Sequence, residues 1–126
     1  MKIRVYYEDT DMGGVVYHSN YLNFCERARS EMFFSKGASP LFEGGHFVVR
    51  RLEADFKKPA RLGDLLEVSV ELMEMKSATL QIRQKVYKGE ELLFEMTLKL
   101  AYLMLDGTIG RLDAAKTEKL RLLLGE

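Results

Sequence analysis

The sequence has little cysteine, little proline, no tryptophan and no excess of charge of either sign. Cys25 is the only cysteine among 126 residues, so no intrachain disulfide can form and no zinc site can be built from several thiolates. Lysine plus arginine and aspartate plus glutamate count 19 each. This balance lacks the basic excess that is typical of nucleic-acid-binding proteins, so we expect no nucleic-acid partner.

Long apolar runs are absent as well. Residues 98–105 form the most apolar segment, but Lys99 interrupts it, and about 20 apolar residues are needed to span a bilayer. The N-terminal residues M-K-I-R-V-Y-Y-E-D lack the apolar region of a secretory signal. We therefore expect a cytoplasmic protein with no integral membrane segment.

The length and the 47% hydrophobic content predict one domain over residues 1–126. Residues 2–8 alternate in polarity and predict a strand with Ile3, Val5 and Tyr7 on one side. A helix is predicted over residues 20–36, with Ser19 or Asn20 as its N-cap and Gly37 at its end. Its apolar positions recur at spacings of three and four: Tyr21, Phe24, Cys25, Ala28 and Met32.

The chain from His46 to Tyr102 alternates in polarity and predicts four strands. Short turns (R-L-G-D, M-K-S-A, K-G-E-E) join them, so consecutive strands should be antiparallel neighbours. The apolar positions that share a face are Val48, Leu52, Ala54 and Phe56; Leu66, Val68, Val70 and Leu72; Leu80, Ile82 and Val86; and Leu92, Phe94, Met96, Leu98, Leu100 and Tyr102.

A turn at Asp106-Gly107 and a short helix capped by Asp113 follow, with Leu120, Leu123 and Leu124 on its apolar side. The order of elements predicts an α+β fold in which the long helix lies across the apolar face of an antiparallel sheet. One helix covers only part of such a sheet, so we expect a homodimer or a larger assembly.

Chemistry-bearing residues gather in the turn before the long helix, Y-Y-E-D-T-D-M-G-G-V-V-Y-H. Asp11 is a candidate general base or nucleophile, although acidic residues before a helix also serve as ordinary partners of its dipole. Gly13-Gly14 permits a sharp turn and leads to helix N-terminal amides, which stabilise oxyanions. His18 suits proton transfer or a hydrogen bond to a carbonyl, and equally a structural role.

The remaining polar residues give weaker signals. Cys25 lies on the apolar stripe and is interpreted as a small buried hydrophobe. The two histidines, His18 and His46, are far apart and indicate no metal site. Glu26, Arg27, Arg29 and Glu31 form a solvated or interface face, of which Glu26 is near enough to the helix start to reach a site. Basic residues at strand ends are either solvated or hold a phosphorylated ligand: Arg50, Arg51, Lys57, Lys58, Arg61 and Lys76.

Residues 5–33 resemble the YbgC-like branch of the 4-hydroxybenzoyl-CoA thioesterase family. The segment D-T-D-x-x-G-V-V-Y-H-x-N-Y is similar to the active-site signature of that family, and F-V-V-R (47–50) and P-A-R-L-G-D (59–64) also look like family segments, in the expected order. The resemblance implies a hotdog fold, an antiparallel sheet wrapped around a central long helix. It also implies dimers or dimers of dimers with active sites at the dimer interface.

The implied activity is hydrolysis of acyl-CoA to a free acid and CoA, without a metal or redox cofactor. By this resemblance Asp11 is the base or nucleophile, His18 assists, and the amides around His18 polarise the thioester carbonyl. Tyr7 is a further aromatic near the site. Substrate contacts are expected from Gly14, Val15, Tyr17, Glu26, Val48 and Val49, and contacts to the CoA phosphates from Lys57, Lys58, Arg61 and Lys76.

Two alternatives remain open at this point. A hotdog dehydratase of hydroxyacyl thioesters also combines a histidine with an acidic residue, although in a different placement. A non-catalytic partner protein linked to the cell-envelope Tol-Pal system is the other. The intact spacing from Asp11 to His18 favours the thioesterase.

Overall fold

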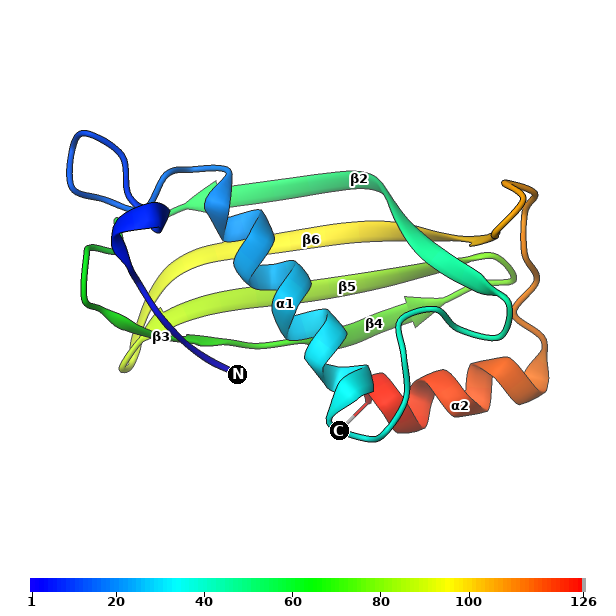
Figure 1. Ribbon diagram of the computed structural model, residues 1–126. Coiled ribbons are helices and arrows are strands. Elements are labelled where there is room, and N and C mark those ends of the chain that lie inside the picture. The colour runs from blue at the N-terminus through cyan, green and yellow to red at the C-terminus, as the bar shows by residue number, and fades with distance from the viewer. Residues whose placement is uncertain (126) are drawn as a thin grey trace.

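A computed structural model describes residues 1–125 and confirms the α+β class. Figure 1 shows α1 lying diagonally across one face of a curved antiparallel sheet, with α2 at the sheet's far end. The elements are β1 (Lys2–Arg4), the short 3-10 helix η1 (Tyr7–Asp9), α1 (Asn20–Phe34), β2 (Gly45–Phe56), β3 (Leu65–Val68), β4 (Glu71–Met75), β5 (Thr79–Lys88), β6 (Glu91–Met104) and α2 (Ala114–Leu124). Within residues 1–125 neither helix has the length and apolar character needed to cross a bilayer.

The strands are ordered β1-β3-β5-β6-β2, and β4 also pairs with β5. The expectation that consecutive strands are neighbours holds for β4–β5 and β5–β6 but is wrong for β2, which pairs with β6 instead of β3. The cause lies in residues 57–64, which bond to the N-terminal turn: the Val16 amide donates to the Ala60 carbonyl at 2.8 Å. These residues lead the chain from one edge of the sheet to the other.

The N-terminal strand is shorter than predicted. It ends at Arg4, the chain turns into η1, and Tyr7 is 84% exposed, so the prediction that Tyr7 shares a buried side with Ile3 and Val5 is wrong. The start of α1 also differs, because the Ser19 side chain makes no capping hydrogen bond and its backbone is already helical. The predicted end is close: α1 stops at Phe34, and Gly37 has the positive φ of 73° that follows many helix ends.

The core forms where the apolar stripe of α1 meets the concave face of the sheet. Tyr21, Phe24, Cys25 and Ala28 are buried, as the spacing predicts, while Met32 is only partly buried. The alternating side chains of β6 from Phe94 to Tyr102 are buried beneath them. The Tyr21 ring stacks on Phe94 with centroids 4.8 Å apart, which fixes the first turn of α1 over the sheet.

The C-terminal helix matches its prediction. Asp113 caps α2 by accepting a 2.9 Å hydrogen bond from the Lys116 amide, and Leu120 and Leu124 are buried. The strand β2 does not match in full, because its register shifts between Val49 and Arg51. Val49 lies opposite Leu100 and faces α1, whereas Val48 lies opposite Ala101 on the outer face. The prediction that Val48 shares a face with Leu52 is therefore wrong, since a bulge reverses the alternation.

Candidate active site

The N-terminal turn is a small hairpin that projects from the end of the sheet. Thr10 and Val16 form a bridge, and the Asp11 amide donates to the Val15 carbonyl at 2.9 Å. Gly14 closes the tip with a φ of 75°, a conformation that a side chain would strain. The glycine pair therefore makes the tip of a hairpin, and helix α1 begins several residues later.

Asp9 is the buried carboxylate of the acidic cluster. It is 5% exposed and accepts hydrogen bonds from the Tyr6 amide at 2.8 Å and from Nδ2 of Asn20 at 2.7 Å. The Asp9 carbonyl also accepts from the Tyr17 amide at 2.9 Å. Asp9 thus connects η1 and the hairpin to the first residue of α1. The sequence suggested Asp11 as the acidic residue that interacts with the helix start, but in the structure this residue is Asp9.

Asp11 lies exposed at the hairpin tip. Its Oδ1 accepts a 2.8 Å hydrogen bond from the Gly13 amide, which fixes the side-chain direction. A Cβ at Gly13 would lie 3.2 Å from that oxygen, so a glycine allows this approach. Among residues 1–125 the other carboxylate oxygen has no protein partner. Asp11 therefore presents an oriented carboxylate to the space around the turn.

His18 lies where the hairpin passes into α1. Its ring is exposed, packs on Tyr17 with centroids 4.5 Å apart, and meets the edge of Phe56 at 6.5 Å. A depression of about 230 Å³ lies beside it and is lined by Val16, His18, Tyr21, Phe56, Lys57, Lys58 and Pro59. Within the described part of the chain, the backbone amides of His18 and Ser19 donate to no acceptor. Free amides at a helix N-terminus stabilise negative charge, so this depression suits a carbonyl that becomes an oxyanion.

Asp11 and His18 share one end of the molecule without touching. The hairpin aligns Asp9 with Tyr17 and Asp11 with Val15, so His18 lies about three residue steps, roughly 10 Å, from Asp11 along the ladder. No hydrogen bond joins the two side chains among the described residues. The two residues are therefore too far apart along the ladder to pair with each other.

The other predicted contacts around the turn divide into two groups. Tyr17 packs on His18, and Val15 bridges to Arg61, so both lie near the depression, although neither lines it. Gly14 shapes the hairpin tip. Tyr7 is exposed on η1, where its carbonyl accepts from the Thr10 hydroxyl at 2.9 Å.

Three of the four predicted phosphate contacts lie beside this site. Lys57 and Lys58 line the depression, and Arg61 bridges to Val15. Lys58 already donates from Nζ to the Glu91 carboxylate at 2.7 Å, and this hydrogen bond raises the Lys58 pKa. Lys76 lies in the β4–β5 turn at the opposite end of the sheet (Figure 1), so a single chain does not bring it into the cluster.

Glu26, Val48 and Val49 lie away from the hairpin. Glu26 is on α1, where it accepts a 2.8 Å hydrogen bond from the Ser30 hydroxyl and lines a second hollow. His46, which the sequence left without a role, lines the same hollow. Val49 lies on the helix-facing side of β2 but does not line this hollow, and Val48 lies on the outer face for the reason given above.

The sequence patterns did not predict a buried polar pair formed by Arg29 and Gln84. Arg29 is half-buried and donates from Nη1 to Oε1 of Gln84 at 2.8 Å, and Gln84, fully buried, donates to the Cys25 carbonyl at 2.9 Å. Burial lowers the pKa of Arg29. The signal was available, since Gln84 occupies the one polar position in the apolar series of Leu80, Ile82 and Val86.

Cys25 is fully buried, and burial raises the pKa of its thiol to about 12, so it is an inert hydrophobe as predicted. Among residues 1–125 no three His, Cys, Asp or Glu side chains are grouped so that they could hold a metal ion. The turn itself supplies a carboxylate, an imidazole and backbone amides.

A model of the thioesterase superfamily matches residues 13–95. The chain belongs to the thioesterase superfamily. The acyl-CoA thioesterase YbgC of Helicobacter pylori is 51% identical over 87 residues, which cover 69% of this chain and 65%, just under two thirds, of that protein. The family assignment confirms the resemblance seen in residues 5–33.

Solved structures of thioesterases share the fold over nearly the whole chain. A probable thioesterase from Bartonella henselae has 36% identity and a TM-score of 0.80 and covers 90% of this chain and 96% of its own. A thioesterase from Thermus thermophilus, solved in complex with coenzyme A and Zn, has 27% identity and a TM-score of 0.83. The match covers 100% of this chain and 94% of the Thermus thermophilus chain. These likenesses confirm the hotdog fold, in which the antiparallel sheet curves around α1.

Proposed function

We propose that this protein hydrolyses acyl-CoA thioesters to a free acid and CoA. The observation that carries the proposal is the pair of free amides, of His18 and Ser19, just before α1 and beside a depression that His18 lines, within a chain so similar to an acyl-CoA thioesterase. The CoA complex of the Thermus thermophilus neighbour supports the substrate class. A cytoplasmic location, where acyl-CoA is available, belongs to the same proposal.

In the proposed reaction the thioester carbonyl accepts hydrogen bonds from the His18 and Ser19 amides. Asp11 takes a proton from water as the water oxygen bonds to the carbonyl carbon, and the amides stabilise the oxyanion that forms. The carbon–sulfur bond then breaks, and the CoA thiolate recovers the proton from Asp11. In the other course Asp11 attacks the carbon, and the carbon–sulfur bond breaks with release of the CoA thiolate. Water then hydrolyses the mixed anhydride to the acid and the Asp11 carboxylate, and the proton set free passes to the thiolate. His18 orients the carbonyl or assists with the proton.

The edge of β2 supports a proposed homodimer. This strand pairs with β6 on one side only, and its helix-facing side chains Val49, Leu52 and Phe56 are 45%, 38% and 54% exposed. A long unpaired edge with apolar neighbours favours association with a second copy. Light scattering on the purified protein measures the mass, and a dimer or a dimer of dimers is expected.

Release of the CoA thiol from a panel of acyl-CoAs tests the activity, and the buried Cys25 thiol leaves the thiol assay free of background. Asp11→Asn should lower kcat by about 10²–10⁴. Glu8→Gln, an exposed carboxylate on the neighbouring η1, is the matched control and should retain wild-type rates. Formation of an enoyl thioester would favour a dehydratase, and a wild type inactive on every acyl-CoA would favour a binding protein.

A single turnover in ¹⁸O-labelled water tests for the covalent course. A mixed anhydride that water opens at the Asp11 carboxyl carbon transfers one unlabelled carboxylate oxygen to the acid product and leaves ¹⁸O in Asp11, which general-base catalysis does not. General-base catalysis places the label in the product alone, as does water attack on the acyl carbon of the anhydride. Mass spectrometry of the peptide that contains Asp11 gives the answer.

A further inference from the structure

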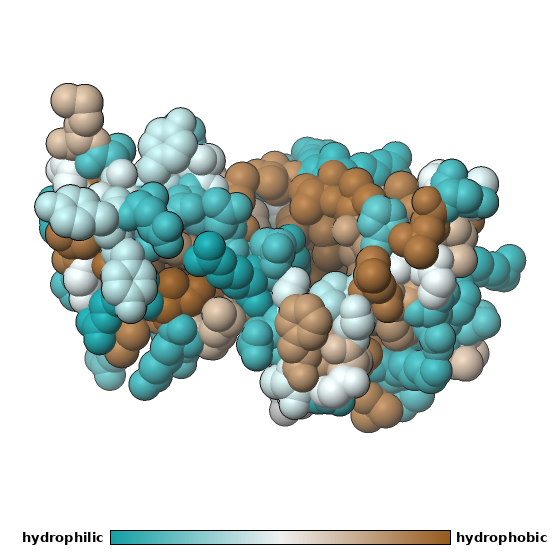
Figure 2. All heavy atoms as spheres, viewed as in Figure 1, coloured by the Kyte–Doolittle hydropathy of each residue, from teal (hydrophilic) through white to brown (hydrophobic). Residues whose placement is uncertain are grey.

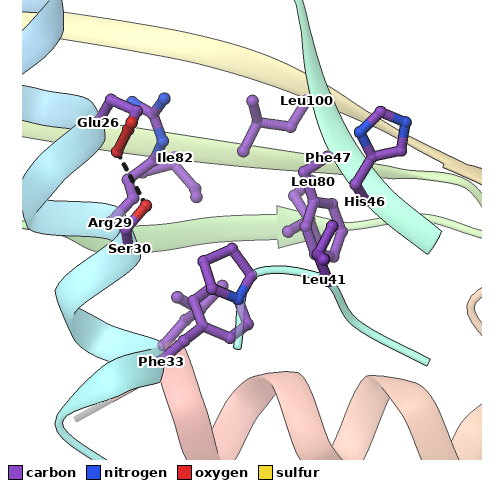
Figure 3. A pocket seen from close by; sticks show the side chains of 12 residues that line it. Glu26, Arg29, Ser30, Phe33, Leu41, His46, Phe47, Leu80, Ile82 and Leu100 are labelled. Atoms are coloured by element: carbon purple, nitrogen blue, oxygen red, sulfur yellow. Dashed lines mark hydrogen bonds between the residues drawn. The ribbon is translucent and has the colours of Figure 1, made fainter. Parts of the chain in front are cut away.

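A second hollow of about 260 Å³ lies between α1, the loop at residues 38–42, β2 and the sheet. Figure 2 shows it as a recess with mainly hydrophobic walls, and Figure 3 shows the side chains that point toward it. Its apolar walls come from elements and loops far apart in the sequence: Phe33, Leu41, Phe47, Leu80, Leu100 and Leu124. A hollow lined in this way suits an aliphatic group.

The charged groups in its wall already have partners. The Glu26 carboxylate accepts from Ser30 at 2.8 Å, and Arg29 donates to Gln84 at 2.8 Å (Figure 3 draws the first bond). These bonds hold the polar wall in place and leave the apolar walls as the main contact for a ligand. Glu26 and Arg29 also carry opposite charges and interact with each other, so the hollow needs no charged ligand to balance them.

A row of apolar side chains on β2 leads from the depression at His18 toward this hollow. The side chains of β2 that face α1 run from Phe56, whose ring meets His18, past Leu52 and Val49 to Phe47 in the hollow. Leu52 and Val49 are 38% and 45% exposed, so this row is open to a ligand. A chain that begins at the helix N-terminus can lie along this row.

The length of α1 measures the path. At a rise of about 1.5 Å per residue, Glu26 and Phe33 lie about 9 Å and about 20 Å along the helix from Asn20. An extended chain advances by about 1.2 Å per bond, because three backbone bonds cover about 3.5 Å. An acyl chain whose carbonyl lies at the helix N-terminus would enter the hollow after about seven bonds and reach Phe33 after about 16.

Leu124 of α2 closes the hollow beyond Phe33. It is 3% exposed and lines the hollow, and Lys36, just after α1, donates to the carbonyls of Leu122 and Leu123 at 2.9 Å each. The end of α2 is thereby held against the end of α1, as Figure 1 shows. This wall is fixed by hydrogen bonds and by the burial of its own helix.

We infer that the hollow binds the distal end of a long aliphatic acyl group, and that Leu124 is the end wall that sets the greatest chain length. The inference rests on the proposed thioesterase function and adds a substrate class to it, saturated acyl groups of about 16 carbons. Each further methylene that enters the hollow should raise kcat/KM about fourfold until Leu124 is reached.

The test is kcat/KM for straight-chain acyl-CoAs from butyryl to stearoyl, measured for wild type, Leu124→Ala and Leu122→Ala. Leu124→Ala removes the end of the wall and should move the longest well-accepted chain by about two carbons. Leu122→Ala is the matched control, because Leu122 is on the same helix, is 67% exposed and does not line the hollow. An unchanged profile in Leu124→Ala would overturn the inference while leaving hydrolysis itself established.

A second variant covers the case in which Leu124→Ala does not fold. Leu41 lines the hollow from an exposed loop, where it is 65% exposed, so Leu41→Trp should fold and narrow the hollow. It should lower kcat/KM at least tenfold for palmitoyl-CoA and leave butyryl-CoA unchanged. Calorimetric titration of Asp11→Asn with palmitate and with butyrate reads binding without catalysis. Tight binding of palmitate alone supports the hollow even if no acyl-CoA is hydrolysed, and equal binding of both contradicts it.

Discussion

The side-chain amide of Asn20, the first residue of α1, donates a 2.7 Å hydrogen bond to the buried carboxylate of Asp9. This bond joins the hairpin that carries Asp11 to the helix whose free amides lie beside His18. Together with the backbone bonds of the hairpin, it sets the relative position of the two candidate catalytic elements. The acidic residues of the turn therefore have different roles. Asp9 holds the hairpin against the start of α1, and Asp11 is exposed at the hairpin tip, where a substrate can reach it.

Asp9→Asn should lower the free energy of unfolding by about 1–3 kcal/mol. An amide replaces one acceptor oxygen with a donor, so either the Tyr6 amide or the Asn20 amide loses its partner in a buried place. Urea denaturation measures the change, with Glu8→Gln as the exposed control on the same short helix. Equal stability of the two variants would show that the bond contributes nothing net.

Gln84→Met should destabilise the protein by about 1–3 kcal/mol although it keeps the side-chain volume. The substitution leaves the Arg29 guanidinium and the Cys25 carbonyl without the partner they share. Gln81→Met, on the outer face of the same strand opposite Lys99, is the control and should change stability little. A stabilising Gln84→Met would mean that the desolvation penalty of the buried pair exceeds the free energy gained from its hydrogen bonds.

The Cys25 thiol should resist labelling in the native state. With a pKa of about 12 it is almost wholly protonated at pH 8, whereas an unfolded thiol has a pKa of about 8.5. The folded protein therefore binds one more proton than the unfolded chain from about pH 9 to about pH 12, and stability falls with rising pH by about 1.4 kcal/mol per unit. Below that window the thiol contributes no slope. Comparison with Cys25→Ala isolates this dependence, and identical slopes in the two proteins would contradict it.

Removal of the cations beside His18 should weaken binding of the CoA nucleotide. Lys57→Ala and Arg61→Ala are expected to raise KM about two- to fivefold with little change in kcat, because exposed charge pairs are each worth about 0.2–1 kcal/mol. The effect should shrink at high salt. Lys76→Ala, at the opposite end of the sheet, is the comparison. A larger effect there would mean that the nucleotide binds at the other end, or across a subunit boundary.

Local patterns were sufficient for most elements. The spacing of Tyr21, Phe24, Cys25 and Ala28 predicts α1, and Asp113 with Leu120 and Leu124 predicts α2, because capping and amphipathicity are properties of neighbouring residues. The order of residues in the turn indicated the thioesterase family. Its roles for Asp11 and His18 stay predictions that the proposed experiments test.

Contacts between distant segments decided the rest. Alternation cannot reveal the bulge after Val49, because one extra residue changes the face without a change in composition. The short link after Phe56 suggests that β2 and β3 are neighbours, but they lie on opposite sides of the β5–β6 pair. Hydrogen bonds from the N-terminal turn to this link lead the chain away from β2. For the same reason Asp9, and not Asp11, is the buried carboxylate: its partners at Tyr6 and Asn20 meet only when the hairpin closes.

The sequence by itself determined the fold class, the family and the residues that stand out in the N-terminal turn, because periodicity and motif order are written along the chain. The tertiary structure alone decided which acid is buried, where Lys76 lies relative to the other cations, and that α2 closes a hollow alongside α1. Those properties depend on distances between segments that only packing brings together. A sequence pattern predicts which side of each helix or strand is apolar, and the packed core decides which other residues that side contacts.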